Sequence, residues 1–329
     1  MSLSTAGKRK RALVLGASGY IGQHVSLSFL ETDWEVIGLG TREKIETSLQ
    51  KNKFFSYMSG DITDPDIQEK VAATNPDVIV FCVSLDQKSS EENISRALEV
   101  NVGSVWNFLD RVNSRLSKPI RLIYLSTIQV YADLIGKIDE HYPVGPRNVY
   151  GLTHLMAEMV TNVSRNLENI HPTVLRLSNG YGPPVGSQPA CWSLVVNDFC
   201  RTAYQEKTIR IVSAGTALRD FVFVRDLAQA IVEVALCKQE KRLLNIVSGK
   251  TISLLNAAVI VRSEYFRRFD KKISIVDVKG DEFELPKSLE KEPTFVFNTN
   301  ELKESNIKIG TEMREGVKSL FSFLERHRI

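Results

Sequence analysis

A glycine-rich turn close to the start of the chain limits its possible folds more than any other feature. Residues 16–22 read GASGYIG, with glycines three positions apart, and directly follow the apolar run at 13–15. A strand that turns into a helix through such glycines brings its backbone close to a pyrophosphate, which the helix N-terminus stabilises. A glycine turn without a ligand is the alternative. We predict a dinucleotide site whose members here are Gly16, Ser18, Gly19, Tyr20, Ile21 and Gly22.

The first half of the chain alternates short β-branched runs with longer amphipathic stretches. This alternation is typical of βαβ units, in which helices cover both faces of a parallel sheet. The predicted strands are 12–15, 36–39, 54–58, 77–83, 121–126 and 173–177. The predicted helices follow Gly19 and Pro65 and cover 94–114 and 150–169. The fold class is therefore α/β, with a Rossmann-type doubly wound parallel sheet.

Glycine and proline crowd between residues 180 and 189, which marks a loop and a domain boundary. Beyond it, predicted helices at 193–206, 224–237, 254–269 and 313–328 alternate with predicted strands at 209–212, 221–224, 244–247 and 273–278. This part is too short for a second full sheet. We predict a dinucleotide-binding domain at 8–180, joined by a strand and a helix from 217–250, and a smaller C-terminal substrate-binding lobe at 181–329.

The composition of the 329 residues excludes several classes of protein. Hydrophobic residues make up 43% and charged residues 25%, as in globular chains, and the net charge of +3 is too small for a surface that follows nucleic acid phosphates. The four cysteines form no C-x-x-C pair, the histidines lack metal-ligand spacing, and no apolar run nears the ~20 residues of a membrane helix. We expect a cytoplasmic protein with no metal, no nucleic acid partner and no membrane partner.

The residues after the second predicted strand bear on the choice of cofactor. An NAD site places a carboxylate there for the ribose 2′-hydroxyl, whereas the 2′-phosphate of NADP needs a cation. This strand runs into Gly40, Thr41 and Arg42 without a carboxylate at the expected position, and Arg42 can make a bidentate phosphate contact. We predict binding by Thr41 and Arg42 and a preference for NADP. NAD stays possible because Glu43 lies just beyond.

A tyrosine motif in the middle of the chain points to a family. Residues 125–131 read LSTIQVY, and residues 150–154, YGLTH, begin a predicted helix. Together with the glycine turn, Asp61-Ile62, Asn101 and the segment RDFVFV at 219–224, these motifs resemble the extended short-chain dehydrogenase/reductase family. That family contains nucleotide-sugar epimerases, dehydratases and keto-reductases. The resemblance covers most of the chain and implies an NAD(P)-dependent enzyme that acts on a nucleotide-linked sugar.

The resemblance also implies roles for individual residues. Tyr150 would be the general acid/base, with His154 beside it, and Thr127 would hold the reacting oxygen. Asp61 and Ile62 would flank the adenine. The other implied cofactor-binding residues are Phe81, Cys82, Val83 and Asn101, together with Tyr150 and His154. The implied substrate-binding residues are Thr127, Asn179, Ser193 and Arg219, with Ser193 as the N-cap of a helix that meets the substrate diphosphate.

Two sites depart from the family pattern. His154 stands where the family has a lysine, whose fixed charge lowers the pKa of the tyrosine. A histidine, with an unperturbed pKa of ~6.5, is mostly neutral at pH 7, so Tyr150 stays protonated and is a better acid than base. This favours reduction of a ketone over oxidation of an alcohol. Ile128 and Gln129 stand where the family's 4,6-dehydratases have acidic residues, which argues against dehydration.

Three functions are compatible with these residues. We expect an NADP-dependent oxidoreductase that reduces a nucleotide-linked keto-sugar by hydride transfer. One alternative is a nucleotide-sugar epimerase that recycles its NAD(P), and another is a non-catalytic dinucleotide-binding sensor of the same fold. Family members often pair through the helices that bear Asn101 and Tyr150 here, so the resemblance also implies a homodimer.

Overall fold

The computed structural model describes residues 9–45, 48–167, 169–186, 189–212, 215–237, 241–283 and 292–329. The chain forms two compact units. The first comprises residues 1–130, 145–175 and 231–243, and the second comprises 131–144, 176–230 and 244–329. Residue 8, where the predicted first domain begins, lies outside the described residues. The domain limits predicted from the sequence stay a prediction.

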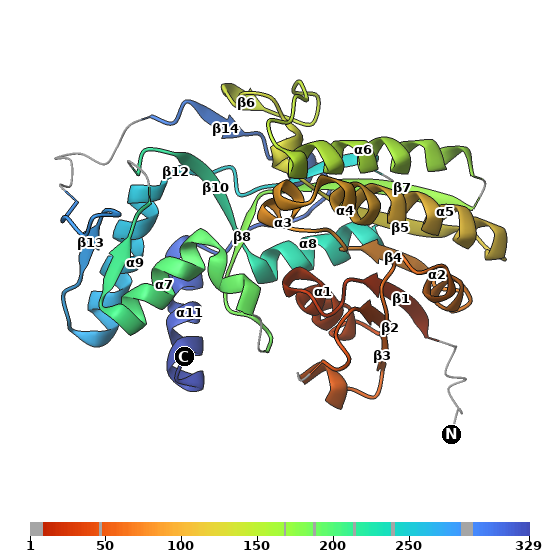
Figure 1. Cartoon of the computed structure of the whole chain (residues 1–329), viewed down its shortest axis with the longest axis horizontal. Helices are drawn as coiled ribbons and strands as arrows, with labels where there is room; N and C mark the ends of the chain where they lie inside the picture. The colour runs from red at the N-terminus through yellow and green to blue at the C-terminus, as the bar shows by residue number, and fades with distance from the viewer. Residues whose placement is uncertain are drawn as a thin grey trace. The chain divides into compact units, whose positions relative to one another are not determined.

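A seven-stranded sheet forms the centre of the first unit, and residues 244–246 of its edge strand β11 belong to the second unit (Figure 1). Its order is β11-β7-β5-β4-β1-β2-β3, and the neighbours from β5 to β3 pair in parallel. The strands are β1 Lys10–Leu15, β2 Trp34–Gly40, β3 Phe55–Ser59, β4 Val78–Phe81, β5 Ile120–Thr127, β7 Ile170–Leu177 and β11 Leu243–Ile246. The predicted α/β class with a Rossmann-like parallel sheet is confirmed.

Continuous apolar runs account for the central strands. All four residues of β4 are buried, and β1 and β5 are buried over most of their length. A strand covered on both faces has no solvent side, so its sequence lacks the alternation of apolar and polar residues. The side chains of Phe81, Phe108 and Tyr124 meet in this core. The same runs made these strands visible in the sequence.

Helices cover the sheet of the first unit, with α1 and α6 on opposite sides of it (Figure 1). The helices are α1 Tyr20–Leu30, α2 Pro65–Ala72, α3 Gln87–Glu92, α4 Ile94–Leu98, α5 Ser104–Arg115 and α6 Val149–Val163, with the second half of α8 Val224–Leu236. α2 begins as predicted, because the Asp64 side chain accepts from Asp66 N and proline occupies the first helical position.

Two helices differ from their predicted ranges. The stretch predicted as one helix at 94–114 consists of α4 and α5, joined by a π-helical turn at Glu99–Gly103. A π turn changes the direction of the side chains that it carries, and such turns are frequent at functional sites. α6 ends at Val163, where Ser164 donates back to Thr161 O at 2.7 Å. Residue 168 of its predicted range lies outside the described residues.

The second unit has small sheets, of order β12-β10-β8, β13-β9 and β14-β6. Its strands are β6 Gly136–Ile138, β8 Asn179–Tyr181, β9 Thr208–Arg210, β10 Leu218–Phe223, β12 Thr251–Ser253, β13 Ser274–Val276 and β14 Phe295–Phe297. Its helices are α7 Val195–Glu206, α9 Leu254–Phe269, α10 Asn300–Glu304 and α11 Met313–His327, with the first half of α8. Tyr265 and Phe269 of α9 pack against Phe321 of α11 in its core. Four three-residue strands, β6, β8, β12 and β14, escaped prediction because so short a run shows no periodicity.

Candidate cofactor and active site

A cavity of about 240 Å³ lies in the first unit, beside the carboxyl ends of β1, β2 and β4. Eight of the predicted cofactor-binding residues line it: Gly16, Ser18, Gly19, Thr41, Asp61, Ile62, Cys82 and Val83. In open α/β sheets, ligands bind outside the carboxyl ends of the strands, at the point where the strand order reverses. The order β4-β1-β2 places that point between β1 and β4. The cavity therefore occupies the position expected for a ligand of this fold.

The glycine turn fits a dinucleotide for two geometric reasons. Gly16 has a φ of +89°, which a residue with a side chain adopts only with strain, and the amides of Gly16 and Ala17 both donate to Leu39 O at 2.8 Å. A Cβ added at Gly22 would lie 2.2 Å from Gly16 O, so α1 approaches the turn more closely than a side chain permits. Such an approach leaves the helix N-terminus open to a pyrophosphate.

Some predicted cofactor residues lie outside the cavity wall. Tyr20, Ile21 and Gly22 form the first turn of α1, where Tyr20 packs edge-on against His24. Phe81 packs into the core instead of lining the cavity with Val83. The reason is that β4 ends at Phe81, so the strand alternation that would give both residues the same direction stops there.

The end of β2 offers the cavity a hydroxyl group. Gly40 and Thr41 line the cavity, whereas Arg42 follows on the surface, and its carbonyl accepts from the Tyr57 hydroxyl at 2.7 Å. Among the described residues that line the cavity, the one carboxylate is that of Asp61, which follows β3. The ribose carboxylate typical of NAD sites is therefore missing from the end of β2, as the sequence indicated.

Arg96 of α4 is a cation on the cavity wall that the sequence analysis missed. Its Nη2 lies 2.7 Å from Asp61 Oδ2, and its Nη1 lies 2.8 Å from Glu99 Oε2. Burial acts to raise the pKa of Asp61, but hydrogen bonds from Thr63 and Arg96 and the charge of Arg96 outweigh it and lower that pKa. No sequence motif marks Arg96, because only the tertiary placement of α4 brings it to Asp61.

Tyr150 and His154 lie one turn apart on α6, and their rings meet edge to face with centroids 4.5 Å apart. The His154 side chain is buried, with 2% of the residue exposed. Its Nδ1 lies 3.0 Å from the Tyr124 hydroxyl, and its Nε2 lies 3.1 Å from the Ser84 hydroxyl. Ser84 also lines the cofactor cavity. One hydroxyl group thus connects the cavity to the tyrosine motif.

Burial controls the protonation of both α6 side chains. It lowers the pKa of His154 to about 4. It also raises the pKa of Tyr150 to about 12, although a hydrogen bond from Ser84 acts to lower that pKa and the charge of Asp86 adds to the rise. At pH 7 the imidazole is neutral and the phenol is protonated. Tyr150 can therefore donate a proton at pH 7, whereas it can act as a base only if other groups stabilise its phenolate.

Close packing brings Thr127 and Tyr150 into the same part of the unit. Thr127 ends β5, and the 3-10 turn Ile128–Val130 follows it. A Cβ at Gly151 would lie 2.4 Å from Gln129 O, so this turn presses against the start of α6. Asn148 caps α6 through Gly151 N at 2.7 Å and also donates to Gln129 Oε1 at 2.7 Å. The catalytic roles of Thr127 and Tyr150 stay a prediction.

Asn101, predicted to bind the cofactor, links two other segments of the protein. It lies in the π turn and is fully buried. Its Oδ1 accepts from Leu85 N at 2.7 Å, and its Nδ2 donates to Thr153 Oγ1 at 2.9 Å. The Asn101 amide therefore fixes the chain beside Ser84 relative to the chain beside His154.

The sequence contains a pattern that indicates the buried polar cluster around His154. Tyr124 and Ser126 are alternate residues of β5, and His154 and Glu158 are one turn apart on α6. Residues two apart on the strand thus pair with residues four apart on the helix. Tyr124 bonds His154, and Ser126 Oγ donates to Glu158 Oε1 at 2.5 Å. Polar residues at alternate positions of an apolar strand, with polar residues at i and i+4 of a following helix, would have indicated this pairing.

The predicted substrate residues Asn179, Ser193 and Arg219 belong to the second unit. Asn179 on β8 donates from Nδ2 to Asp220 O at 2.9 Å on the neighbouring strand β10. Arg219 is exposed, and its Nη1 donates to Leu218 O at 2.8 Å. Asp220, between Arg219 and Phe221, is buried and accepts from Ser248 N at 3.0 Å. Asp220 thus holds a turn of this unit in place.

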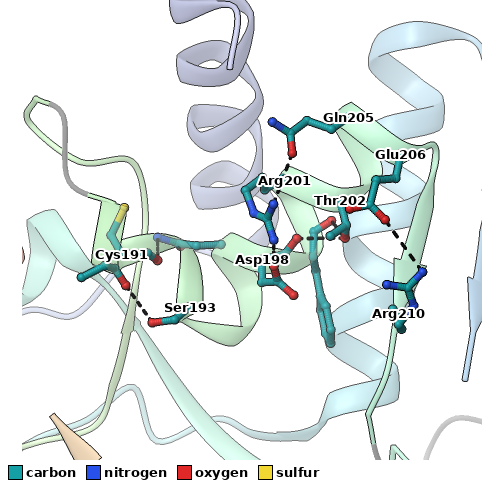
Figure 2. Close-up of polar contacts among 11 residues, drawn as sticks. Cys191, Ser193, Asp198, Arg201, Thr202, Gln205, Glu206 and Arg210 are labelled. Carbon is teal, nitrogen blue, oxygen red and sulfur yellow. Dashed lines mark hydrogen bonds and ion pairs between the residues drawn. The ribbon is translucent and has the colours of Figure 1, made fainter. Parts of the chain in front are cut away.

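Ser193 does not cap α7, and this prediction was wrong (Figure 2). α7 begins at Val195, and Leu194 at the N-cap position makes no capping bond. Ser193 instead ends a 3-10 turn and donates to Ala190 O at 2.7 Å. Serine hydroxyls readily form such local bonds, which compete with capping. Figure 2 also shows Arg201 of α7 bonded to Asp198 and Gln205 of the same helix.

The described part of the chain contains neither a candidate metal cluster nor a membrane-spanning helix. No group of three or more His, Cys, Asp or Glu residues there is placed to hold a metal ion. None of the helices in these ranges combines the length and the apolar character that crossing a bilayer requires. The cysteines are free thiols, and burial raises the pKa of Cys82 on the cavity wall. Cys82 therefore has little thiolate character at neutral pH.

Comparison with known proteins places this geometry in context. Residues 12–246 match the model of the NAD dependent epimerase/dehydratase family. A UDP-glucose 4-epimerase of Mycolicibacterium smegmatis is 28% identical over 238 residues, covering 68% of this chain and 72% of that protein. A UDP-glucuronate 4-epimerase of Thermodesulfobacterium geofontis is 24% identical over 289 residues, covering 81% and 87%.

Solved structures agree on the fold. The structure of a UDP-glucuronic acid 4-epimerase from Bacillus cereus, in complex with UDP-glucuronic acid and NAD, superposes with a TM-score of 0.79 at 20% identity, covering 96% of this chain and 99% of that one. The family match extends from β1 to the end of β11, so it includes the glycine turn, the cavity and the tyrosine motif. The chain belongs to the NAD-dependent epimerase/dehydratase family of enzymes, within the extended short-chain dehydrogenases/reductases.

Proposed function

We propose that this chain is a nucleotide-sugar epimerase that oxidises and re-reduces one sugar carbon with a cofactor that is not consumed. The Ser84 hydroxyl carries the proposal, because Ser84 lines the dinucleotide cavity, its Oγ lies 3.1 Å from His154 Nε2, and its hydrogen-bonding effect acts to lower the pKa of Tyr150. It ties the tyrosine of the family motif to the cofactor site. The relatives named 4-epimerases of UDP-glucose and UDP-glucuronate support a UDP-linked sugar as the substrate.

Tyr150 would carry the proton of this reaction. As a phenolate it accepts the proton of the sugar hydroxyl during oxidation, and it returns that proton to the keto oxygen during reduction. The glycine turn and the cavity wall would hold the dinucleotide, which would supply the hydride chemistry of both half-reactions. Thr127 would orient the reacting oxygen through its hydroxyl. Since burial raises the pKa of Tyr150 to about 12, oxidation is the half-reaction that the protein itself disfavours at neutral pH.

The residues after Thr127 support epimerisation over sugar dehydration. Ile128 is apolar and buried, and the Gln129 side chain accepts from Asn148 Nδ2 at 2.7 Å. Dehydration needs groups that remove and deliver protons at adjacent sugar carbons. Neither side chain titrates, so neither supplies such a group.

A second candidate is reduction of a nucleotide-linked keto-sugar with consumption of NADPH. Two observations favour it. The protonated Tyr150 beside a neutral His154 suits proton donation to a ketone, and the end of β2 lacks a ribose carboxylate. The preference for NADP over NAD belongs to this proposal, with Arg42 as the residue that would bind the 2′-phosphate.

Substrate binding and assembly complete the proposal. Asn179, Ser193 and Arg219 of the second unit would bind the sugar nucleotide, with Arg219 as the cation for its diphosphate. A homodimer is supported by apolar side chains that are exposed on α5 and α6 of the first unit, namely Trp106, Leu152, Met159 and Val163. If this face pairs two copies, Met159→Glu lowers the mass in sedimentation analysis to that of a monomer.

Product analysis separates the candidate functions. The purified protein is incubated with UDP-glucose or UDP-glucuronate and a trace of NAD or NADP, and separately with UDP-4-keto-sugars and one equivalent of NADPH. Formation of the C4 epimer without net cofactor change supports the epimerase, whereas equimolar loss of NADPH supports the reductase. Tyr150→Phe is the control for both. Cofactor binding without turnover in either assay would reject both candidates and favour a sensor.

A further inference from the structure

Two buried side chains, Tyr124 and His154, and two half-buried ones, Ser84 and Tyr150, form a row. Tyr124 is 1% exposed, and its hydroxyl lies 3.0 Å from His154 Nδ1. On the other side of the ring, Nε2 lies 3.1 Å from Ser84 Oγ. The Tyr150 ring contacts the His154 ring with centroids 4.5 Å apart, and the hydrogen-bonding effect of Ser84 acts to lower the pKa of Tyr150. The order along the row is therefore Tyr124, His154, Ser84 and Tyr150.

The direction of the protons follows from the Tyr124 hydroxyl. Within the described residues, His154 Nδ1 is the one hydrogen-bond partner of this hydroxyl. A buried O–H needs an acceptor, so Tyr124 donates and Nδ1 carries no proton. Because burial keeps His154 neutral, its single proton is on Nε2 and is donated to Ser84 Oγ. The first two hydrogen bonds thus both point toward Tyr150.

The Ser84 hydroxyl has one proton and two acceptors within reach. It donates to Leu85 O at 2.8 Å, and the Tyr150 oxygen, whose pKa Ser84 acts to lower, is its second acceptor. A phenolate is a stronger acceptor than a peptide carbonyl, so the proton turns to Tyr150 once that residue ionises. The donation from His154 Nε2 then polarises the Ser84 O–H, as in other hydrogen-bonded chains.

The charged residues that act on the row are acidic. Asp86, at the start of α3, raises the pKa of Tyr150, and Glu158 of α6 raises the pKa of Tyr124. In the described part of the chain, no cation contributes to the pKa of either tyrosine. The ionised form of Tyr150 must therefore be stabilised by neutral dipoles or by the bound cofactor.

Asn101 holds Ser84 and His154 at their positions in the row through their neighbours in the chain. It bonds Leu85 N, next to Ser84, and Thr153 Oγ1, next to His154, at 2.7 and 2.9 Å. The π turn that carries Asn101 thus holds the two segments from which the central pair of the row projects.

We propose that Tyr124, His154 and Ser84 form a directed chain of neutral hydrogen bonds that stabilises the Tyr150 phenolate in place of the family's lysine. Tyr124 and Ser84 are positioning residues in this chain, and His154 transmits the polarisation through its Nε2–H tautomer. The activity part of the inference rests on the proposed function, whereas the tautomer and the phenolate do not require a substrate.

The first test is nuclear magnetic resonance of the protein labelled with ¹⁵N-histidine, with His154→Gln to assign the signal. We expect the Nε2–H tautomer in the parent protein and its loss as a single form in Tyr124→Phe. A dominant Nδ1–H tautomer in the parent protein would overturn the chain. This measurement stands even if no nucleotide sugar is turned over, so failure of the function and failure of the chain are distinguishable.

The second test follows Tyr150 ionisation by phenolate absorbance, with Tyr150→Phe subtracted. A hydrogen bond to a charged group is worth about 1–2 pH units of pKa, so Ser84→Ala is expected to raise the Tyr150 pKa by that amount. Ser84→Thr, which keeps the hydroxyl, is expected to restore it. Ser90→Ala is the control, because the hydroxyl of Ser90 also bonds Leu85 O, at 3.5 Å, but lies outside the chain; Ser90 is fully buried, whereas Ser84 is half-buried. An unchanged titration in both Ser84→Ala and Tyr124→Phe would refute the proposal.

In the active enzyme, the same variants separate positioning from substrate binding. We expect Ser84→Ala and Tyr124→Phe to move the alkaline limb of kcat for oxidation to higher pH while leaving KM for the sugar nearly constant. A parental pH profile, or a loss confined to KM, contradicts a role in stabilising the phenolate.

Discussion

The glycine turn at 16–22 and the cluster around His154 belong to the same unit and meet at one cavity, which Gly16 and Ser84 both line. The turn is a backbone structure: it depends on amides that donate to Leu39 O and on the lack of a side chain at Gly22. The cluster depends on side chains, since His154 is held between two hydroxyl groups. The turn is thus defined by its backbone geometry, and the cluster by the hydrogen bonds and protonation of its side chains.

This difference determines how each site responds to change. The turn acts through backbone amides, which do not titrate, whereas a single added methyl group disturbs it. In the cluster, by contrast, burial shifts the pKa values of Tyr150 and His154 far from their ordinary range. The lesson is that steric changes test the first site, whereas pH and isosteric changes test the second.

Replacing the proton-transfer group gives the largest expected effect on the cluster. Tyr150→Phe keeps the ring and its edge contact with His154 but removes the hydroxyl. Turnover should fall by ~10²–10⁴-fold, the usual range for a lost general acid/base, while cofactor affinity stays nearly constant. Steady-state kinetics and calorimetry measure the two quantities. Near-normal turnover would remove Tyr150 from the mechanism.

The stability of the protein should depend on pH through His154. The pKa of His154 is about 4 in the folded state and ~6.5 in the unfolded chain. Between pH ~6.5 and ~4, His154 is therefore protonated in the unfolded chain but neutral in the folded protein. Stability therefore falls as pH is lowered from ~6.5 to ~4, by about 3 kcal/mol in total, and has no contribution from this residue above ~6.5. Urea unfolding of the parent and of His154→Gln measures it. The exposed His141→Gln is the control, and equal acid sensitivity in all three proteins contradicts the prediction.

Cofactor selectivity tests the cavity between the two sites. If Arg42 binds the 2′-phosphate, Arg42→Ala should weaken NADP(H) by about 10- to 100-fold and leave NAD(H) unchanged, because a charge-assisted contact is worth ~1.5–3 kcal/mol. Calorimetry with both cofactors measures this. The exposed Lys44→Ala nearby is the control. Tighter binding of NAD(H) than NADP(H) by the parent protein would reject the preference.

The smallest effect is expected from a methyl group in the glycine turn. In Gly22→Ala the new Cβ meets Gly16 O, and relief of this contact requires a backbone shift that costs about 1–3 kcal/mol. The midpoint temperature of thermal unfolding and the affinity for the cofactor should both decrease, and the pH dependence of each should stay the same. Gly310→Ala is the matched control, since a Cβ there meets no atom within 4 Å. Wild-type affinity in Gly22→Ala would show that the turn is not a close-packed phosphate site.

Local patterns were enough to predict much of the first unit. The central strands β1, β4 and β5 are apolar over most of their length, and the cap at Asp64 and the glycines at 16 and 22 each act on nearby residues of the chain. Ser193 shows where a local rule fails, because two local hydrogen bonds competed and the bond to Ala190 O won. The π turn at 99–103 was not predicted either, because it spans five residues, too few for the apolar spacing to distinguish a π turn from an α-helix.

The sequence by itself determined the parallel sheet, the glycine turn and the tyrosine motif, because each rests on residues that are neighbours along the chain. Only the tertiary structure brought Tyr124, Ser84 and His154 together, since they come from a strand, a loop and a helix far apart in sequence. It alone also paired Arg96 with Asp61. The physical reason is that burial and hydrogen-bond direction depend on the groups that surround a residue in space. The sequence therefore shows that residue 154 is a histidine, whereas the fold is needed to decide which ring nitrogen carries its proton.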